Sequence, residues 1–281
     1  MSTLNPEPDV ALEVRTFVGG SAMPVVVVKG LGGSAASDRL VQEMAAHFTV
    51  ITMSPRNSGE STGSLTLDNL IHDVRFVVEH AAQEHGAVPG VVAHSMGAYA
   101  VARLLEHAPV TPRAALLAPL LDITEQNPDV MNWYFRRSLA KNRVPGAVRI
   151  ISSFYTAFIA PPSEQARPTG MSLSQQRFDH GDVLPFLHSI FNAPRITRPL
   201  QTPTLILVAG RSNAGLRIRN LDQLASTWRS LQATGSELEV LPELDHFLSQ
   251  GGEFFSSSRT PELVARMAAF LRGASPQQSA A

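Results

Sequence analysis

The chain has 281 residues, with 23 basic and 24 acidic side chains and a formal net charge of −1. Such a balanced charge gives no long-range field for nucleic acid or an anionic membrane, so we expect a small uncharged or mixed ligand as the partner. The chain has no cysteine, which excludes disulfides, thiolate–metal sites and cysteine nucleophiles. A chain of this length buries roughly three quarters of its unfolded surface, which suits one large α/β domain with or without an inserted subdomain.

The N-terminal segment and the apolar runs bear on location. The first residues carry acidic side chains and have neither a basic start nor an apolar run, so we expect no signal peptide. The longest apolar stretches, such as Pro24 to Val28 and Ala114 to Leu121, are far shorter than the roughly 20 residues of a membrane span. We therefore expect a soluble, cytoplasmic protein with no membrane partner.

Short apolar runs alternate with helical patterns along the chain. Continuous apolar runs are typical of strands that are buried on both faces, as in a parallel sheet. They cover Val25–Lys29, Phe48–Met53, Gly90–Ala93, Ala114–Ala118, Thr204–Val208 and Leu238–Leu241. The helical patterns cover Asp68–Glu84, Gly97–His107, Asn220–Leu231 and Pro261–Arg272. This alternation predicts an α/β fold with a doubly wound, mostly parallel sheet.

The alternation breaks between about Leu121 and Pro199, in a segment rich in aromatic residues and proline. We predict several helices there, inserted as a cap at residues 122–198 into a core formed by residues 1–121 and 199–281. Some of the aromatic side chains could line an apolar pocket between cap and sheet. Residues 1–9 and 274–281 are expected to be disordered tails.

The segment Val91–Gly97, VVAHSMG, places a serine between a predicted strand and a predicted helix. Small residues, Ala93 and Gly97, stand two positions before and two positions after Ser95. A sharp strand-to-helix turn has no room for bulky neighbours and presents the hydroxyl at the carboxyl edge of the sheet. The alternative is that Ser95 merely caps the following helix.

Together with this motif, the chain resembles the α/β-hydrolase superfamily over nearly its whole length. Four further stretches fit in order: KGLGGSA resembles the oxyanion loop, SPRNSGES the Arg-Gly-x-Gly-x-Ser turn, TPTLILVAG the strand before the acidic triad member, and LPELDHF the loop of the catalytic histidine. The inserted segment lies where many members have a helical cap. The resemblance implies the α/β-hydrolase fold.

The resemblance also implies roles for individual residues. Ser95 would be the nucleophile and His246 the general base that activates it. The backbone N–H groups of Leu31 and Met96 would form the oxyanion hole, which stabilises charge that develops in the transition state. His94, between the small residue and the serine of the turn, is expected to orient its neighbours or to pack.

Three positions depart from the family pattern. Lys29 stands where a histidine usually precedes the loop glycine, and Ala93 replaces the first glycine of the turn. Asn213 stands at the position of the triad acid. An asparagine can orient an imidazole, but it cannot stabilise an imidazolium by charge.

Two aspartates are further candidates for the acid. Asp122 lies just past the strand that follows the serine turn, although the residue that matches the alternative acid position of some members is Ala118. Asp245 is disfavoured, because the side chains of adjacent residues diverge. The third member of the triad is therefore left open.

The sequence favours a serine hydrolase of a small, largely apolar ester, lactone or thioester. The alternatives are a cofactor-independent cyclase, lyase or oxygenase of the same fold, and a non-catalytic ligand-binding protein. We expect no cofactor and no metal, since no His/Asp/Glu cluster stands at ligand spacing. The sequence indicates nothing about the oligomeric state.

Overall fold

The computed structural model describes residues 2–30, 33–119, 189, 192–210, 221–250 and 254–273. Most of the predicted cap and the predicted tail at 274–281 lie outside the described residues. So do three candidate site residues, Leu31, Asp122 and Asn213. The predicted cap boundaries and the roles of these three residues therefore stay predictions.

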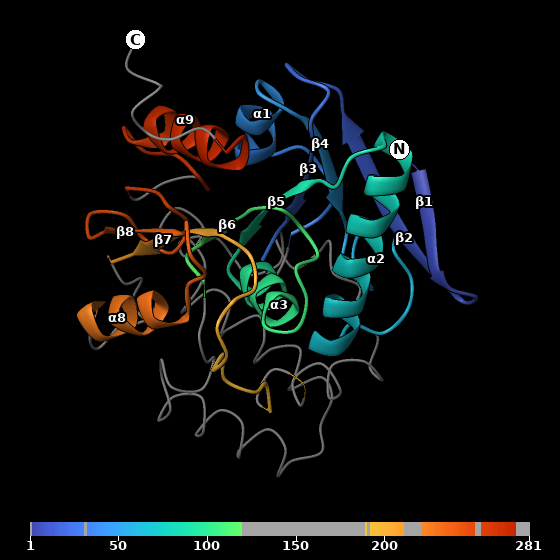
Figure 1. Cartoon of the computed structure of the whole chain (residues 1–281). Helices are drawn as coiled ribbons and strands as arrows, with labels where there is room; N and C mark the ends of the chain where they lie inside the picture. Colours follow the sequence, from blue (N-terminus) through green and yellow to red (C-terminus); the bar gives the residue numbers. More distant parts are fainter. Residues whose placement is uncertain are drawn as a thin grey trace, which may run out of the picture.

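The described residues form one sheet of eight strands in the order β1-β2-β4-β3-β5-β6-β7-β8 (Figure 1). The strands are β1 (Ser2–Glu7), β2 (Val10–Phe17), β3 (Pro24–Val28), β4 (Thr49–Met53), β5 (Gly90–His94), β6 (Ala114–Leu117), β7 (Thr204–Ala209) and β8 (Glu237–Leu241). The six neighbouring strands β4-β3-β5-β6-β7-β8 pair in parallel. The pairs β1–β2 and β2–β4 are antiparallel. The carboxyl ends of the parallel strands therefore meet at one edge of the sheet.

Helices cover both faces of this sheet (Figure 1). Within the described residues they are α1 (Arg39–Ala45), α2 (Leu67–His85), α3 (Met96–Leu105), α8 (Leu221–Leu231) and α9 (Thr260–Leu271). Buried side chains of α2, α3 and α8 share one hydrophobic cluster, and those of α1 and α9 share the other. The doubly wound, mostly parallel α/β fold predicted from the sequence is confirmed, with strand and helix ends within about one or two residues of those expected.

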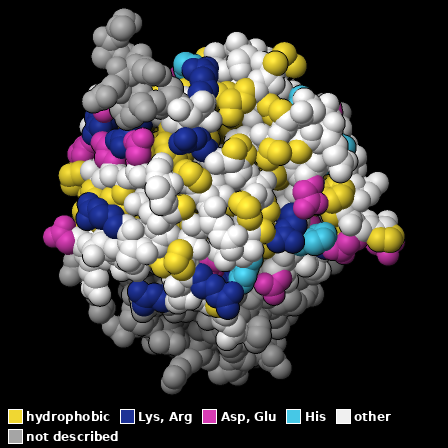
Figure 2. Space-filling model, viewed as in Figure 1, with side chains coloured by type: hydrophobic (Ala, Val, Ile, Leu, Met, Phe, Trp, Pro, Cys, Tyr) yellow, Lys and Arg dark blue, Asp and Glu magenta, His cyan; other side chains and the backbone are white. Residues whose placement is uncertain are grey.

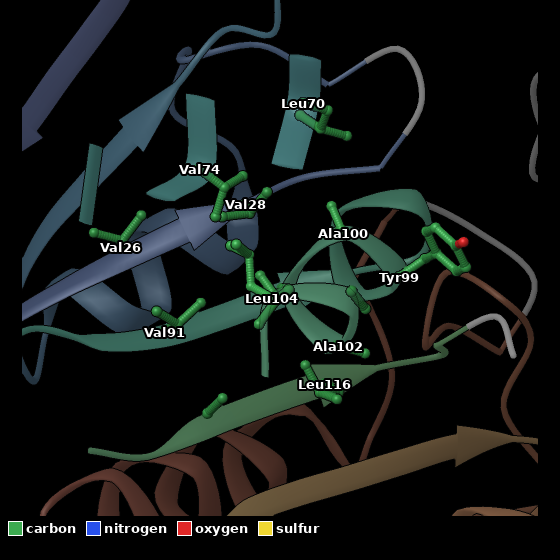
Figure 3. Close-up of a cluster of buried hydrophobic side chains, with 14 of the residues drawn as sticks. Val26, Val28, Leu70, Val74, Val91, Tyr99, Ala100, Ala102, Leu104 and Leu116 are labelled. Carbon is green, nitrogen blue, oxygen red and sulfur yellow. The ribbon is translucent and has the colours of Figure 1, made fainter. Parts of the chain in front are cut away.

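Strand β3 shows why a continuous apolar run is needed. Successive side chains of a strand point to opposite faces. Because helices cover both faces of the sheet, all five residues of β3 are buried. Val26 and Val28 pack in the cluster with Leu70 and Leu104, from α2 and α3, as Figure 3 shows. Val25 and Val27, one position earlier in the alternation, belong to the cluster on the other face.

Residues 2–7 are not a disordered tail, so the prediction of a tail over residues 1–9 is wrong for them. Ser2–Glu7 form the edge strand β1, in antiparallel register with β2. Leu4 stands opposite Leu12 and packs against the core, and the Glu7 carboxylate lies 2.6 Å from Arg56 Nη2. The backbone pairing with β2, the Leu4 side chain and the Glu7–Arg56 ion pair hold this largely polar segment.

Arg56 ties the loop after β4 to helix α2. Its Nε and Nη2 donate to the two carboxylate oxygens of Asp73, at 2.9 and 2.8 Å, and Asp73 is fully buried. In the same loop, the Ser58 hydroxyl donates to the Gly33 carbonyl at 3.3 Å, and Ser54 Oγ accepts from the amide of Ala35 at 2.8 Å. These two hydrogen bonds attach the loop that follows β3 to the loop that follows β4.

Ion pairs link α9 and the residue before it to β8, the edge strand at the other end of the sheet from β1. Arg266 lies 3.0 Å from Glu237, and Arg259 lies 2.7 Å from Glu239. Elsewhere, basic and acidic side chains are interspersed on the face that Figure 2 shows, in agreement with the balanced net charge. Among the described helices, none is both long and apolar enough to cross a membrane.

Asp73→Asn should lower the free energy of unfolding by about 3 to 5 kcal/mol, because it leaves the buried Arg56 guanidinium with the exposed Glu7 as its charged partner and removes the buried carboxylate. Urea unfolding at pH 7 measures the change. The control is Glu43→Gln, which removes the exposed Arg39–Glu43 pair at 3.6 Å and should cost less than about 1 kcal/mol. Equal effects of the two substitutions would contradict the role of the buried pair.

Candidate active site

Ser95 occupies a strained turn between β5 and α3. Its φ of 54° and ψ of −119° lie where residues other than glycine are rare, at a cost of order 1–3 kcal/mol. The Ser95 amide still donates to the Leu117 carbonyl at 3.0 Å, so the pairing of β5 with β6 continues into the turn. The Ser95 side chain makes no capping bond to α3, which argues against the interpretation of Ser95 as a simple helix cap.

The small residues around Ser95 allow this turn. A Cβ at Gly97 would lie 2.6 Å from the carbonyl oxygens of both Val28 and Lys29, so α3 can approach β3 only with glycine there. A Cβ at Gly30 would lie 2.9 Å from the Ser95 Cβ. Ala93, which replaces the first glycine of the family pattern, is fully buried on β5 without interrupting it.

His246 lies in the loop that follows β8, and its Nε2 is 2.7 Å from Ser95 Oγ. Both side chains are buried. In the tautomer that carries its proton on Nδ1, the imidazole accepts the serine hydroxyl hydrogen at Nε2, which is the arrangement a general base requires. The structure therefore brings together the two residues that the sequence singled out, across 151 positions of the chain.

The loop that carries His246 is organised by Asp245. One oxygen of its carboxylate accepts from the amides of Phe247 and Ser249, at 2.9 and 3.0 Å. The Leu248 amide donates to the Asp245 carbonyl at 2.8 Å, which closes the turn. Asp245 thus bonds to the backbone of its own loop.

Burial decides the protonation of His246. Burial, with a smaller contribution from the neighbouring His94, lowers the pKa of the imidazole from 6.5 to about 3. Within the described part of the chain, no carboxylate forms a hydrogen bond or ion pair with His246. The end of β6, where some related proteins have the acid, holds Ala118, with a φ of 43°. His246 is therefore a neutral acceptor in the resting protein.

The amide of Met96 is the first of α3, where helix N–H groups have no acceptor within the helix. It follows Ser95 directly, and its role as a donor to an oxyanion stays a prediction. The second predicted donor, Leu31, lies outside the described residues. Residues 31–32 are not described, whereas Gly30 and Gly33 on either side of them are, and the Gly33 amide donates to the Gly30 carbonyl at 3.0 Å.

The sequence interpretation missed the partner of Lys29. Lys29 is buried, and its Nζ lies 2.8 Å from Asp38 Oδ2 and donates to the Ala36 carbonyl. The other oxygen of Asp38 caps α1 by accepting from the Val41 amide at 3.0 Å. The aspartate just before a helical pattern was the available signal. In the parts of the chain that the structure describes, no group of three or more His, Asp or Glu side chains could hold a metal ion.

The family model described as "Alpha/beta hydrolase family" matches residues 25–265. Among curated proteins, none matches the chain significantly. Many solved structures are similar. A hydrolase from Pseudomonas aeruginosa has a TM-score of 0.67 and 16% identity, and the match covers 96% of this chain and 97% of that one.

Two further solved structures have informative names. A thermophilic esterase from Thermogutta terrifontis has a TM-score of 0.65 and 18% identity, with 94% of each chain covered. An enol-lactonase from Burkholderia xenovorans has a TM-score of 0.64 and 18% identity, with 94% of this chain and 98% of that one covered. At these identities, the similarity is one of fold.

The His246 ring should stay neutral from pH 8 down to about pH 5, because burial makes its charged form unfavourable. A histidine that gains its proton only near pH 3 keeps its acceptor lone pair throughout this range. Ring-nitrogen NMR across the titration measures the protonation state, with the signals assigned by their loss in His246→Gln. A midpoint near 6.5, the ordinary value, would show that the imidazole is not buried as described.

Proposed function

The chain belongs to the alpha/beta hydrolase family, and on that premise we propose that it is a serine hydrolase. Its substrate would be a small, largely apolar ester, lactone or thioester. The observation that carries the proposal is the 2.7 Å contact between Ser95 Oγ and His246 Nε2 at a strained strand-to-helix turn. Strain of this kind persists only where the surrounding structure enforces it, and it is concentrated at functional sites.

In the first half of the reaction, Ser95 Oγ attacks the carbonyl carbon of the substrate and His246 Nε2 takes the hydroxyl proton. The new oxyanion accepts from the Met96 amide and, as the sequence predicts, from that of Leu31. Collapse of the intermediate breaks the bond to the alcohol or thiol, which leaves with the proton from His246. Ser95 is then acylated.

In the second half, water attacks the acyl carbon and gives one proton to His246. The bond to Ser95 Oγ breaks, the serine regains its hydrogen from His246, and the acid is released. Each half needs a neutral imidazole at its start, which the burial of His246 supplies. Each also passes through an imidazolium, for which Asn213 at the acid position would offer orientation without charge.

The surroundings of the pair support an apolar substrate. The rings of Phe247 and Phe254 lie 5.8 Å from His246 and 4.9 Å from His94, respectively. The nearby Lys29 and Asp38 neutralise each other. The fold is shared with a named esterase and a named enol-lactonase, so chemistry at a carbonyl group of this kind is compatible with it.

A fluorophosphonate probe should label the wild type at one site and should fail to label Ser95→Ala and His246→Ala. The probe reacts only with an activated serine, so the substrate need not be known. Intact mass spectrometry detects the adduct. Ser230→Ala, which removes an exposed serine on α8, is the control and should label like the wild type. A folded wild type that takes up no probe would contradict the proposal.

Hydrolysis of p-nitrophenyl butyrate, γ-butyrolactone and a short acyl thioester tests the substrate class. Ser95→Ala and His246→Ala should each lower kcat/KM by at least about 1,000-fold, because the two residues act as a unit. Turnover that needs His246 but survives Ser95→Ala would instead indicate a cyclase, lyase or oxygenase. Binding without turnover would indicate a ligand-binding protein.

A further inference from the structure

We propose that His94 is a positioning residue that fixes the backbone of His246, and so keeps the imidazole of His246 at the Ser95 hydroxyl. This inference rests on the proposed function, because it concerns the geometry of the same reacting pair. His94 would restrain the main chain of His246, which neither Ser95 nor the imidazole of His246 does.

The contact that carries the inference is between His94 Nε2 and the carbonyl oxygen of His246, at 2.8 Å. A carbonyl oxygen can only accept, so His94 Nε2 carries the proton and donates it. The acceptor belongs to the same residue whose ring meets Ser95. The bond therefore restrains the main chain at the base itself rather than elsewhere in its loop.

The position of His94 in the chain gives this bond its importance. His94 is the last residue of β5, and the next residue is Ser95. Its backbone holds the nucleophile in the parallel sheet, while its side chain holds the base. One residue thus links the two halves of the pair, which otherwise come from loops 151 positions apart.

The His94 ring is fixed in place by its neighbours. It is 4% exposed and lies 4.9 Å from the Phe254 ring and 5.1 Å from the His246 ring, centroid to centroid. A Cβ at position 30 would lie only 3.2 Å from His94 Nδ1, so Gly30 leaves the room that this ring fills. Rotation of the ring would break the hydrogen bond and the packing together.

The charge state of His94 suits this role. Burial lowers its pKa to about 4, although the bond to the His246 carbonyl and the charge of Asp38 act in the opposite direction. His94 is therefore neutral at ordinary pH and donates through its single N–H. A cation there would lie 5.1 Å from His246 and would oppose the imidazolium formed during the reaction.

Two substitutions test the hydrogen-bond donor and the aromatic ring of His94 separately. His94→Gln keeps an N–H donor at about the same distance from Cα but loses the aromatic ring, whereas His94→Phe keeps a ring and loses the donor. The readout is fluorophosphonate labelling of Ser95, resolved into the maximal rate kinact and the half-saturating concentration KI. Thermal unfolding of each variant shows whether it is folded.

In His94→Phe we expect kinact to fall about 10- to 100-fold, as for other groups that orient a functional side chain, with KI within about threefold of the wild type. His94→Gln should restore most of the rate. If the phenylalanine variant does not fold, His94→Leu, which is smaller and also lacks a donor, replaces it with the same expected loss.

Three results would overturn the inference. A folded donor-free variant with the kinact of the wild type would show that the hydrogen bond does not position His246. A glutamine variant as slow as the phenylalanine variant would show that the donor is not what matters. In both of these cases, labelling of the wild type would still support the proposed function. The third result is a wild type that does not label, which would overturn both proposals.

Discussion

The parallel register of the sheet is the constraint on which the site depends. It brings the ends of β3, β5, β6 and β8 to one edge, so Gly30, Ser95, Ala118 and the His246 loop all follow strands that finish there. Yet β6 and β7 separate β5 from β8, which at the usual strand spacing is a gap of about 14 Å. The loop after β8 must therefore extend back across two strands, and the turns within it determine where the imidazole arrives.

Burial of His246 has two opposing effects. It keeps the imidazole neutral and able to accept a proton, and it raises the free energy of the imidazolium that the proposed reaction requires. In a complete triad, a carboxylate offsets the second effect, but the position at which the sequence predicts the acid holds Asn213. The other compensation available to such a site is geometric. A base held rigidly by its backbone loses little by reorientation in each proton transfer, and its rate depends on position more than on charge.

Much of the fold could be predicted from the sequence, because buried parallel strands must be apolar on both faces and their helices must be apolar on one. The edge strand β1 was missed because such a strand needs little apolar surface, and Leu4 alone faces the core within a polar segment. The inner strand β2 was missed because its buried Val10, Leu12 and Val14 alternate with other residues and form no continuous apolar run. Ser95 and His246 follow from a turn motif and from a position after the last strand. The bond from His94 to the His246 carbonyl could not be predicted, since it depends on the turn that Asp245 builds.

The ion pairs of β8 have a consequence beyond the stability of α9. An edge strand exposes backbone donors and acceptors that can template the addition of a strand from another molecule, the first step toward fibrils. On β8, Glu237 and Glu239 are held by Arg266 and Arg259, so an approaching strand would meet charged side chains already engaged with a helix. Charged side chains of this kind on an edge strand disfavour the addition of a strand from another molecule.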